Sequence, residues 1–171
     1  MADKLITDRT AGDIQRETAK GFYNASDLNR VEGVAGELAG FLRELPGLLT
    51  AYGKGLGIDW KQSRLGYDPA SLELRTRTDW TMLDIPDGSD AERYLNNVLA
   101  VCKALRVDAA GVPWTLDRLT YTGANAIEAS LDRAQKARYA LEEREKDRLD
   151  RTAQAWPMAG EIFTGEGEMM E

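Results

Sequence analysis

The sequence predicts a mainly α-helical protein: three main helices in a bundle, an extended irregular loop region and a long charged helix towards the C-terminus. The first observation is an apolar stripe with alternating steps of three and four residues, formed by Leu28, Val31, Ala35, Leu38, Leu42, Leu45, Leu49 and Tyr52. Such spacing places side chains on one face of a helix. The second observation is that similar stripes recur over residues 91–105 and 124–134.

The first long helix is predicted over residues 26–52. Residues 1–9 precede it as an extended lead, and Thr10 caps a short helix that reaches Lys20. Because proline lacks an N–H group, Pro46 predicts a kink or break near Leu45. The apolar stripe is expected to be a packing or assembly seam, whose N-terminal half is core in each subunit. The residues assigned to this seam are Leu28, Val31, Leu38, Leu42, Leu45 and Leu49.

Residues 53–88 are predicted to be irregular. Over residues 72–78, apolar or β-branched residues alternate with charged ones, which predicts a short strand that either pairs with a neighbour or stays extended. Trp80 and Trp114 are predicted to anchor loops onto helices. A capping box at Ser89–Glu92 begins the second helix, which ends near Val107. Asn and Asp residues beside the helix starts are interpreted as caps, and Cys102 as a buried structural thiol.

The last helix is predicted from about Thr122 to Trp156. Between Asp132 and Arg151, 13 of 20 residues are charged, seven of them basic and six acidic, which indicates either a solvated helix or a loose coiled-coil arm. The chain therefore divides into a helical core domain with its lead (1–131), a charged helical extension (132–156) and a flexible acidic tail (157–171). In the tail, Ile162 and Phe163 are expected to dock on a partner or a neighbouring copy.

The composition argues against most enzyme classes. The chain has no histidine and one cysteine, so imidazole-based catalysis and cysteine-rich metal sites are excluded, and only paired carboxylates remain as catalytic chemistry. We therefore assign no catalytic residues, no metal ligands and no cofactor. The net charge of −7 argues against nucleic-acid binding. No apolar stretch approaches the roughly 20 residues of a membrane span.

Short motifs spaced along nearly the whole chain resemble a family of tail-associated proteins of phages and prophages of Firmicutes. The motifs that carry this resemblance are Thr7–Thr10, Tyr23–Glu32, Thr78–Met82, Asp84–Pro86, Arg93–Asn97, Leu119–Thr122, Ala124–Glu128 and Gly160–Glu166. The resemblance implies a virion component of the fibre or baseplate region, and it supplies no binding residues. The charged segment 132–151 and Pro157 depart from the family pattern.

The sequence thus favours a non-enzymatic structural protein of a phage tail or tail-like particle, made in the bacterial cytoplasm and located in the virion. Its expected partners are other tail proteins and further copies of itself, as a trimer by analogy with fibres. Two alternatives belong to other classes: a module that binds surface carbohydrate, and a small acidic protein that binds a host factor. Stacked exposed tryptophans would favour the carbohydrate module, and a one-sided acidic surface would favour the host-factor binder.

Overall fold

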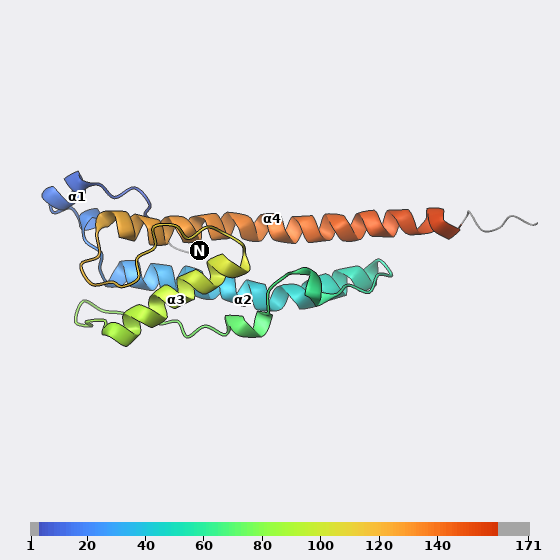
Figure 1. Cartoon of the computed structure of the whole chain (residues 1–171), viewed down its shortest axis with the longest axis horizontal. Helices are drawn as coiled ribbons and strands as arrows, with labels where there is room; N and C mark the ends of the chain where they lie inside the picture. Colours follow the sequence, from blue (N-terminus) through green and yellow to red (C-terminus); the bar gives the residue numbers. More distant parts are fainter. Residues whose placement is uncertain (1–3, 161–171) are drawn as a thin grey trace, which may run out of the picture.

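The computed structural model describes residues 4–160, which are mainly helical and contain no strand. The predicted fold class is confirmed by three main helices, α2 (Ala25–Gly55), α3 (Gly88–Ala104) and α4 (Tyr121–Gly160) (Figure 1). The short elements are α1 (Ala11–Gln15) and three 3₁₀ helices, η1 (Ala19–Gly21), η2 (Gln62–Arg64) and η3 (Pro69–Leu72). These short pieces lie in the lead and in the segment that joins α2 to α3.

The three main helices begin at the same end of the molecule, which we call the head end (left in Figure 1). Arg30, near the start of α2, bonds to Glu128 near the start of α4. At the far end, the Tyr52 hydroxyl donates to Asp150 Oδ1 at 2.9 Å. The helices are therefore parallel, so residues 56–87 and 105–120 return the chain to the head end each time.

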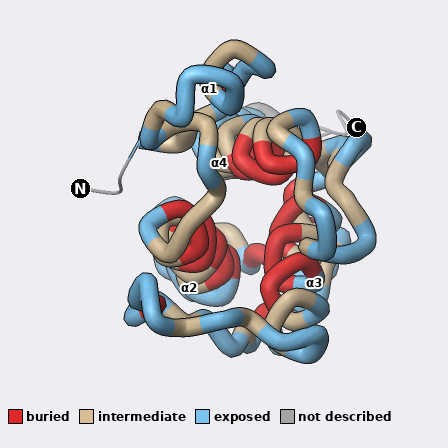
Figure 2. The backbone as a smooth tube through the Cα atoms, turned by 90° about the vertical axis from the view of Figure 1, so that its left-hand side faces the viewer, coloured by how far each residue is buried: buried red, intermediate tan, exposed pale blue. Residues whose placement is uncertain are grey.

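The core lies between the three helices, and Figure 2 shows their buried sides facing one another. All six residues of the predicted seam, Leu28, Val31, Leu38, Leu42, Leu45 and Leu49, are buried in this core. They pack against residues of α3 and α4 of the same chain. A contact with a second copy through these side chains would require the bundle to open.

The charged part of α4 also packs onto the bundle. Leu141 and Leu149 belong to the same core cluster as the α2 stripe, and Leu149 lies beside Gly53 near the end of α2. The helix is continuous from Tyr121 to Gly160, so it extends past Pro157 and beyond its predicted end near Trp156. Its outer faces carry the ion pairs Lys136–Asp132 and Lys146–Glu142, whose side chains are exposed or partly exposed.

Of the kink or break predicted at Pro46, the break is wrong, because α2 runs through this residue as one helix. A proline at position 46 leaves the carbonyl oxygen of Leu42 without its helical N–H donor. The hydroxyl of Tyr67 donates to that oxygen at 3.0 Å and replaces the missing bond. A side chain of the segment that follows α2 thus replaces the hydrogen bond that α2 lacks at Pro46.

Of the two alternatives for residues 72–78, pairing with a neighbouring strand is wrong, because this backbone is bound by side chains instead of by another strand. Asn97 Nδ2 and the guanidinium of Arg93, both on α3, donate to the carbonyl oxygen of Arg75, at 2.8 Å each. The alternation of apolar and charged residues over 72–78 therefore reflects an extended segment that lies across α2 and α3.

Three predicted helix boundaries need correction. The short helix of the lead, α1, ends at Gln15 instead of Lys20, since Glu17 takes a left-handed conformation with φ of 50°. Helix α3, predicted to begin with a capping box at Ser89–Glu92, begins at Gly88. Its cap is Asp87, whose carboxylate accepts from the N–H of Asp90 at 2.8 Å. Ser89 donates its hydroxyl to the Asp87 carboxylate, so it supports the cap and does not form it. The same helix ends at Ala104, short of Val107.

Replacing one buried leucine of the α2 stripe should destabilise the whole bundle. For Leu42→Ala, which removes a fully buried side chain, we expect the free energy of unfolding to fall by about 2–5 kcal/mol. Leu48→Ala on the same helix truncates a half-exposed side chain and should cost less than about 1 kcal/mol. Urea denaturation followed by circular dichroism measures both. Equal losses would contradict the placement of the stripe in the core.

Candidate functional site

Four buried charged side chains join the lead to α2 and α4 at the head end, and we call Arg9, Asp27, Arg30 and Glu128 the buried ion cluster. Glu128 Oε1 accepts from Arg9 Nη2 at 2.7 Å and from Arg30 Nη2 at 2.9 Å. Its Oε2 accepts from the N–H of Ile6 at 2.6 Å and from Arg30 Nε at 3.0 Å. Asp27 bonds both arginines. Two positive and two negative charges balance, so burial leaves no net charge.

Two asparagines hold extended segments against the helices by bonding both polar groups of one residue's backbone. Asn125 on α4 accepts from the N–H of Arg9 at 3.0 Å and donates to its carbonyl at 2.8 Å. Asn29 on α2 does the same for Trp80, at 2.8 and 2.9 Å. The interpretation of asparagines beside helix starts as caps holds for Asn24, whereas the sequence predicts no role for Asn29 and Asn125. They lie one turn inside their helices, which is the sequence signal that separates them from caps.

Two further polar contacts close the interface between α2 and α3. The hydroxyls of Tyr23 and Tyr94 bond each other, and burial raises the pKa of both, so both stay neutral. Glu32 is buried and accepts from Arg93 and from Asn97 Nδ2, the latter at 3.1 Å. The buried carboxylates of this end are therefore occupied by donors of the same chain.

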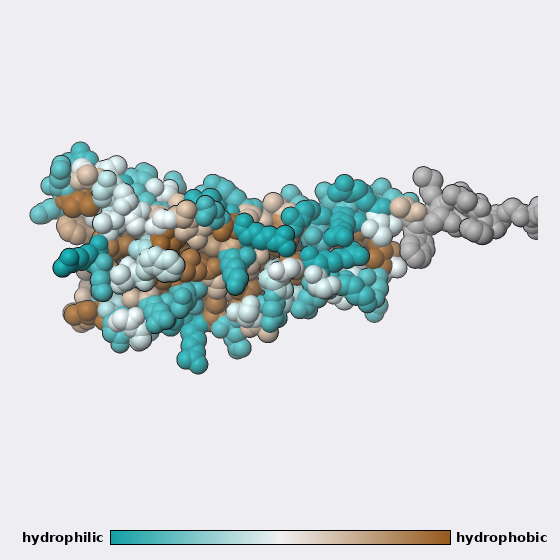
Figure 3. Space-filling view, viewed as in Figure 1, coloured by the Kyte–Doolittle hydropathy of each residue, from teal (hydrophilic) through white to brown (hydrophobic). Residues whose placement is uncertain are grey.

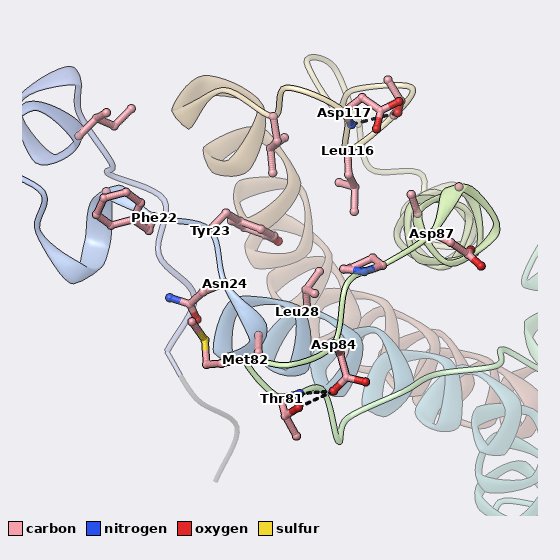
Figure 4. Close-up of a pocket in the computed structure, with 18 residues that line it drawn as sticks. Phe22, Tyr23, Asn24, Leu28, Thr81, Met82, Asp84, Asp87, Leu116 and Asp117 are labelled. Carbon is pink, nitrogen blue, oxygen red and sulfur yellow. Dashed lines mark hydrogen bonds between the residues drawn. The ribbon is translucent and has the colours of Figure 1, made fainter.

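A pocket of about 590 Å³ opens at the head end, and we call it the head pocket (Figure 4). Segments far apart in the sequence surround it, with Tyr23 before α2, Met82 in the first return segment and Leu116 in the second. Its wall is apolar where the helices begin. The apolar side chains that line it include Tyr23, Ala25, Leu28, Ala91, Leu116 and Leu119.

Large apolar side chains are exposed around this pocket, and Figure 3 shows hydrophobic atoms (brown) at the surface of the head end. We call Ile14, Phe22, Met82, Leu83, Ile85 and Trp114 the head cluster, all of them exposed. The first three line the pocket, and the others adjoin lining residues in the sequence. Leu83 is 93% exposed, Ile85 is 91% exposed and Trp114 is 94% exposed.

The two tryptophans predicted as loop anchors, Trp80 and Trp114, differ in burial. Trp80 is 5% exposed and lies under the guanidinium of Arg77, 3.9 Å from the ring centroid, so it is an anchor as predicted. Trp114 is exposed, so its prediction as an anchor is wrong. The second return segment is held instead by Leu116 and Leu119, which pack against the core.

The charged residues that line the head pocket are Asp84, Asp87 and Asp117. The hydroxyl of Thr81, then the guanidinium of Arg77 and the N–H of Thr81, lower the pKa of Asp84 to about 2. The N–H of Asp90 and the hydroxyl of Ser89 lower the pKa of Asp87. Both carboxylates are therefore ionised and weakly basic at neutral pH, which suits them to binding positive charge and not to moving protons.

Other chemistry has little support in residues 4–160. This range holds no group of three His, Cys, Asp or Glu side chains placed to bind a metal ion, and none of its helices has the length and apolarity needed to cross a membrane. Burial raises the pKa of the Cys102 thiol to about 11, as expected for a structural cysteine. Ile162 and Phe163, the predicted docking residues, lie outside the described residues, so their docking stays a prediction.

Comparison of the chain with known protein families, with curated proteins and with solved structures gave no match. The candidate site therefore stands on its geometry alone. That geometry is an apolar pocket with an exposed apolar rim and an acidic edge, held in place by a buried ion cluster.

Removing the central carboxylate of the buried ion cluster should be strongly destabilising. Glu128→Ala leaves two buried arginines with Asp27 alone, and we expect the free energy of unfolding to fall by about 3–5 kcal/mol. Glu128→Gln keeps the shape but not the charge, so its loss should be smaller. Thermal and urea unfolding measure both variants.

The matched control for this prediction is Glu143→Ala, which removes an exposed glutamate of the same helix. It should change the free energy of unfolding by about 0.5 kcal/mol or less. A Glu128→Ala protein as stable as this control would show that the cluster does not hold the lead in place.

The Asp84 carboxylate should stay ionised well below the usual range for aspartate. Its pKa in the folded protein is lowered from 3.8 to about 2, so its contribution to stability is present above about pH 3.8 and is lost as the pH falls through about 2. Thr81→Ala removes the first cause and should raise the pKa towards 3.8. Carboxyl NMR titration measures the shift, with Thr152→Ala on α4 as control. An unchanged midpoint in Thr81→Ala would refute this cause.

Proposed function

We propose that this chain is a non-enzymatic structural protein of a phage tail or tail-like particle, which contributes to fibre or baseplate assembly by binding other proteins. The observation that carries the proposal is the head cluster. Six large apolar side chains are exposed around one pocket, and a grouped apolar surface of this kind marks a site of protein interaction. In the assembled particle, this surface would be covered by another tail protein or by a further copy of the chain.

The family resemblance directs the proposal towards the tail. Seven of the motifs that carry it lie in the described residues, and they contain much of the polar network at the head end. The network residues that fall within these motifs are Arg9, Tyr23, Asp27, Asn29, Arg30, Glu32, Trp80, Arg93, Tyr94, Asn97, Asn125 and Glu128. In this chain the motif residues support the surface that we propose as the binding face.

The chemistry of the carboxylates favours this proposal over an enzymatic function. Glu32, Asp27 and Glu128 are buried and paired with arginines, so a substrate would have to displace a buried ion pair to reach them. The carbohydrate alternative loses support, because Trp60 and Trp80 are each 5% exposed, so they cannot form a sugar-stacking platform together with the exposed Trp114.

Mass spectrometry of purified particles tests the proposal directly, and a variant of the head cluster tests the binding face. Leu83→Ser combined with Ile85→Ser replaces two exposed side chains, so the isolated chain should keep its melting temperature. We expect its amount in particles to fall at least about tenfold, which corresponds to roughly 1.4 kcal/mol of lost binding. Tyr139→Ser, an exposed change on α4, is the control and should be incorporated normally.

Absence of the wild-type chain from mature particles would refute a structural function in the tail. Normal incorporation of the double variant would leave the chain in the particle but refute the head cluster as its binding face.

A further inference from the structure

We propose that the head pocket binds a segment of another protein that carries a large apolar side chain next to lysine or arginine. This inference rests on the proposed function as a protein-binding component and adds the chemistry of the partner. It follows from three properties of the head end: the shape of the pocket, the exposed rim and the sign of the charges around it.

The pocket has the size and lining of a site for apolar side chains. Its volume of about 590 Å³ lies within the range of sites that enclose a ligand of several side chains. Leu28, Leu116 and Leu119 form an apolar wall at the start of the helices. An apolar side chain that enters the pocket would be transferred from water to an apolar surface, which favours binding.

The rim would be covered by the same segment. Met82, Leu83 and Ile85 alternate with Asp84 and Pro86 in one short loop, and their apolar side chains are more than three-quarters exposed. The lining residues Met82, Asp84 and Pro86 place this loop at the mouth of the pocket. A segment that inserted one side chain into the pocket would therefore lie against this loop.

The charges around the pocket select the partner. Eighteen residues line it, and the charged ones among them are Asp84, Asp87 and Asp117. Asp84 is paired with Arg77, whereas Asp87 bonds backbone N–H and hydroxyl groups, which keep it ionised. Residues 77–93 contain four aspartates, one glutamate and two arginines, Arg77 and Arg93, at the two ends. Both arginines are paired with acidic side chains, which leaves the segment with an excess of negative charge. Basic groups beside the inserted side chain would be attracted to this edge, and acidic groups would be repelled.

The same charges argue against the C-terminal residues of this chain as the occupant. Residues 161–171 carry four glutamates and no basic residue. They follow Gly160 at the end of α4, a 40-residue helix about 60 Å long that begins beside the pocket. In the pocket of this chain or of a second copy, these glutamates would meet like charge.

A random twelve-residue peptide library, displayed and selected on the immobilised full-length chain, tests the proposal. Each round is depleted on Leu116→Asp, which places a charge in the pocket wall, so that only pocket-dependent peptides remain. We expect the enriched peptides to carry a large apolar residue beside lysine or arginine. Their affinity for the wild-type chain is then measured by fluorescence anisotropy.

Charge reversal at the edge gives the decisive comparison. Asp117→Lys should lower the affinity of the enriched peptides for the chain at least about tenfold. Glu143→Lys, a charge reversal at an exposed position on α4, should leave that affinity unchanged. Both positions are exposed, so both variants should fold, and equal melting temperatures verify this. No enrichment over Leu116→Asp, enrichment of acidic peptides, or equal binding by Asp117→Lys would each overturn the proposal.

Two outcomes separate this inference from the proposed function. If the head cluster variant is lost from particles but selection yields no basic peptide, the partner chemistry is wrong and the structural function stands. If sedimentation shows that the isolated chain self-associates and Ile85→Ser abolishes this, the occupant is a second copy and the inference is overturned.

Discussion

Glu128 is the residue on which the head end of this bundle depends. Its carboxylate accepts four hydrogen bonds, from the Arg9 and Arg30 guanidiniums and from the backbone of Ile6. The lead thereby packs onto α2 and α4, and the chain enters α2 through Phe22 and Tyr23, which form part of the pocket wall. The binding face is therefore supported by a buried electrostatic contact as well as by apolar packing.

The parallel arrangement of the three helices imposes a second constraint. Parallel helices bring the positive ends of their dipoles together at the head end, which is unfavourable unless negative groups lie nearby. Capping boxes place Asp27 and Asp90 in the first turns of α2 and α3, and lysines occupy their last turns. These acidic residues keep the head end compatible with parallel packing, and Asp87, the cap of α3, is also part of the acidic pocket edge.

The sequence predicted what depends on local pattern and missed what depends on distant partners. The stripe of α2 was predictable because a period of three and four residues specifies one face of a helix. The continuity of α2 at Pro46 was not predictable. It depends on the hydroxyl of Tyr67, 21 residues after the proline, and no sequence pattern assigns that hydroxyl to the carbonyl of Leu42. Trp80 and Trp114 occur in similar loops, and only their tertiary surroundings decide that the first is buried and the second exposed.

The candidate site was less predictable than the fold for the same reason. The buried ion cluster joins residues that occur in four separate positions of the chain, and a charged residue in a sequence is ordinarily expected to be solvated. Asn29 and Asn125 resemble caps until the extended segments that they bind are placed beside them. The head pocket is formed by the ends of elements and by loops, where side-chain periodicity carries no information.

The distance along the chain between Ile6 and Glu128 has a consequence for how the protein is made. These residues are 122 positions apart, yet they are joined by a hydrogen bond. On a ribosome, the lead emerges first and waits until α4 has been synthesised, several seconds later at about 5–20 residues per second. Throughout that interval Arg9 can pair with Asp27 but not with Glu128, and the α2 stripe lacks its cover from α4. The nascent chain therefore exposes its most apolar helix longest, and completion of α4 is the step that ends this exposure.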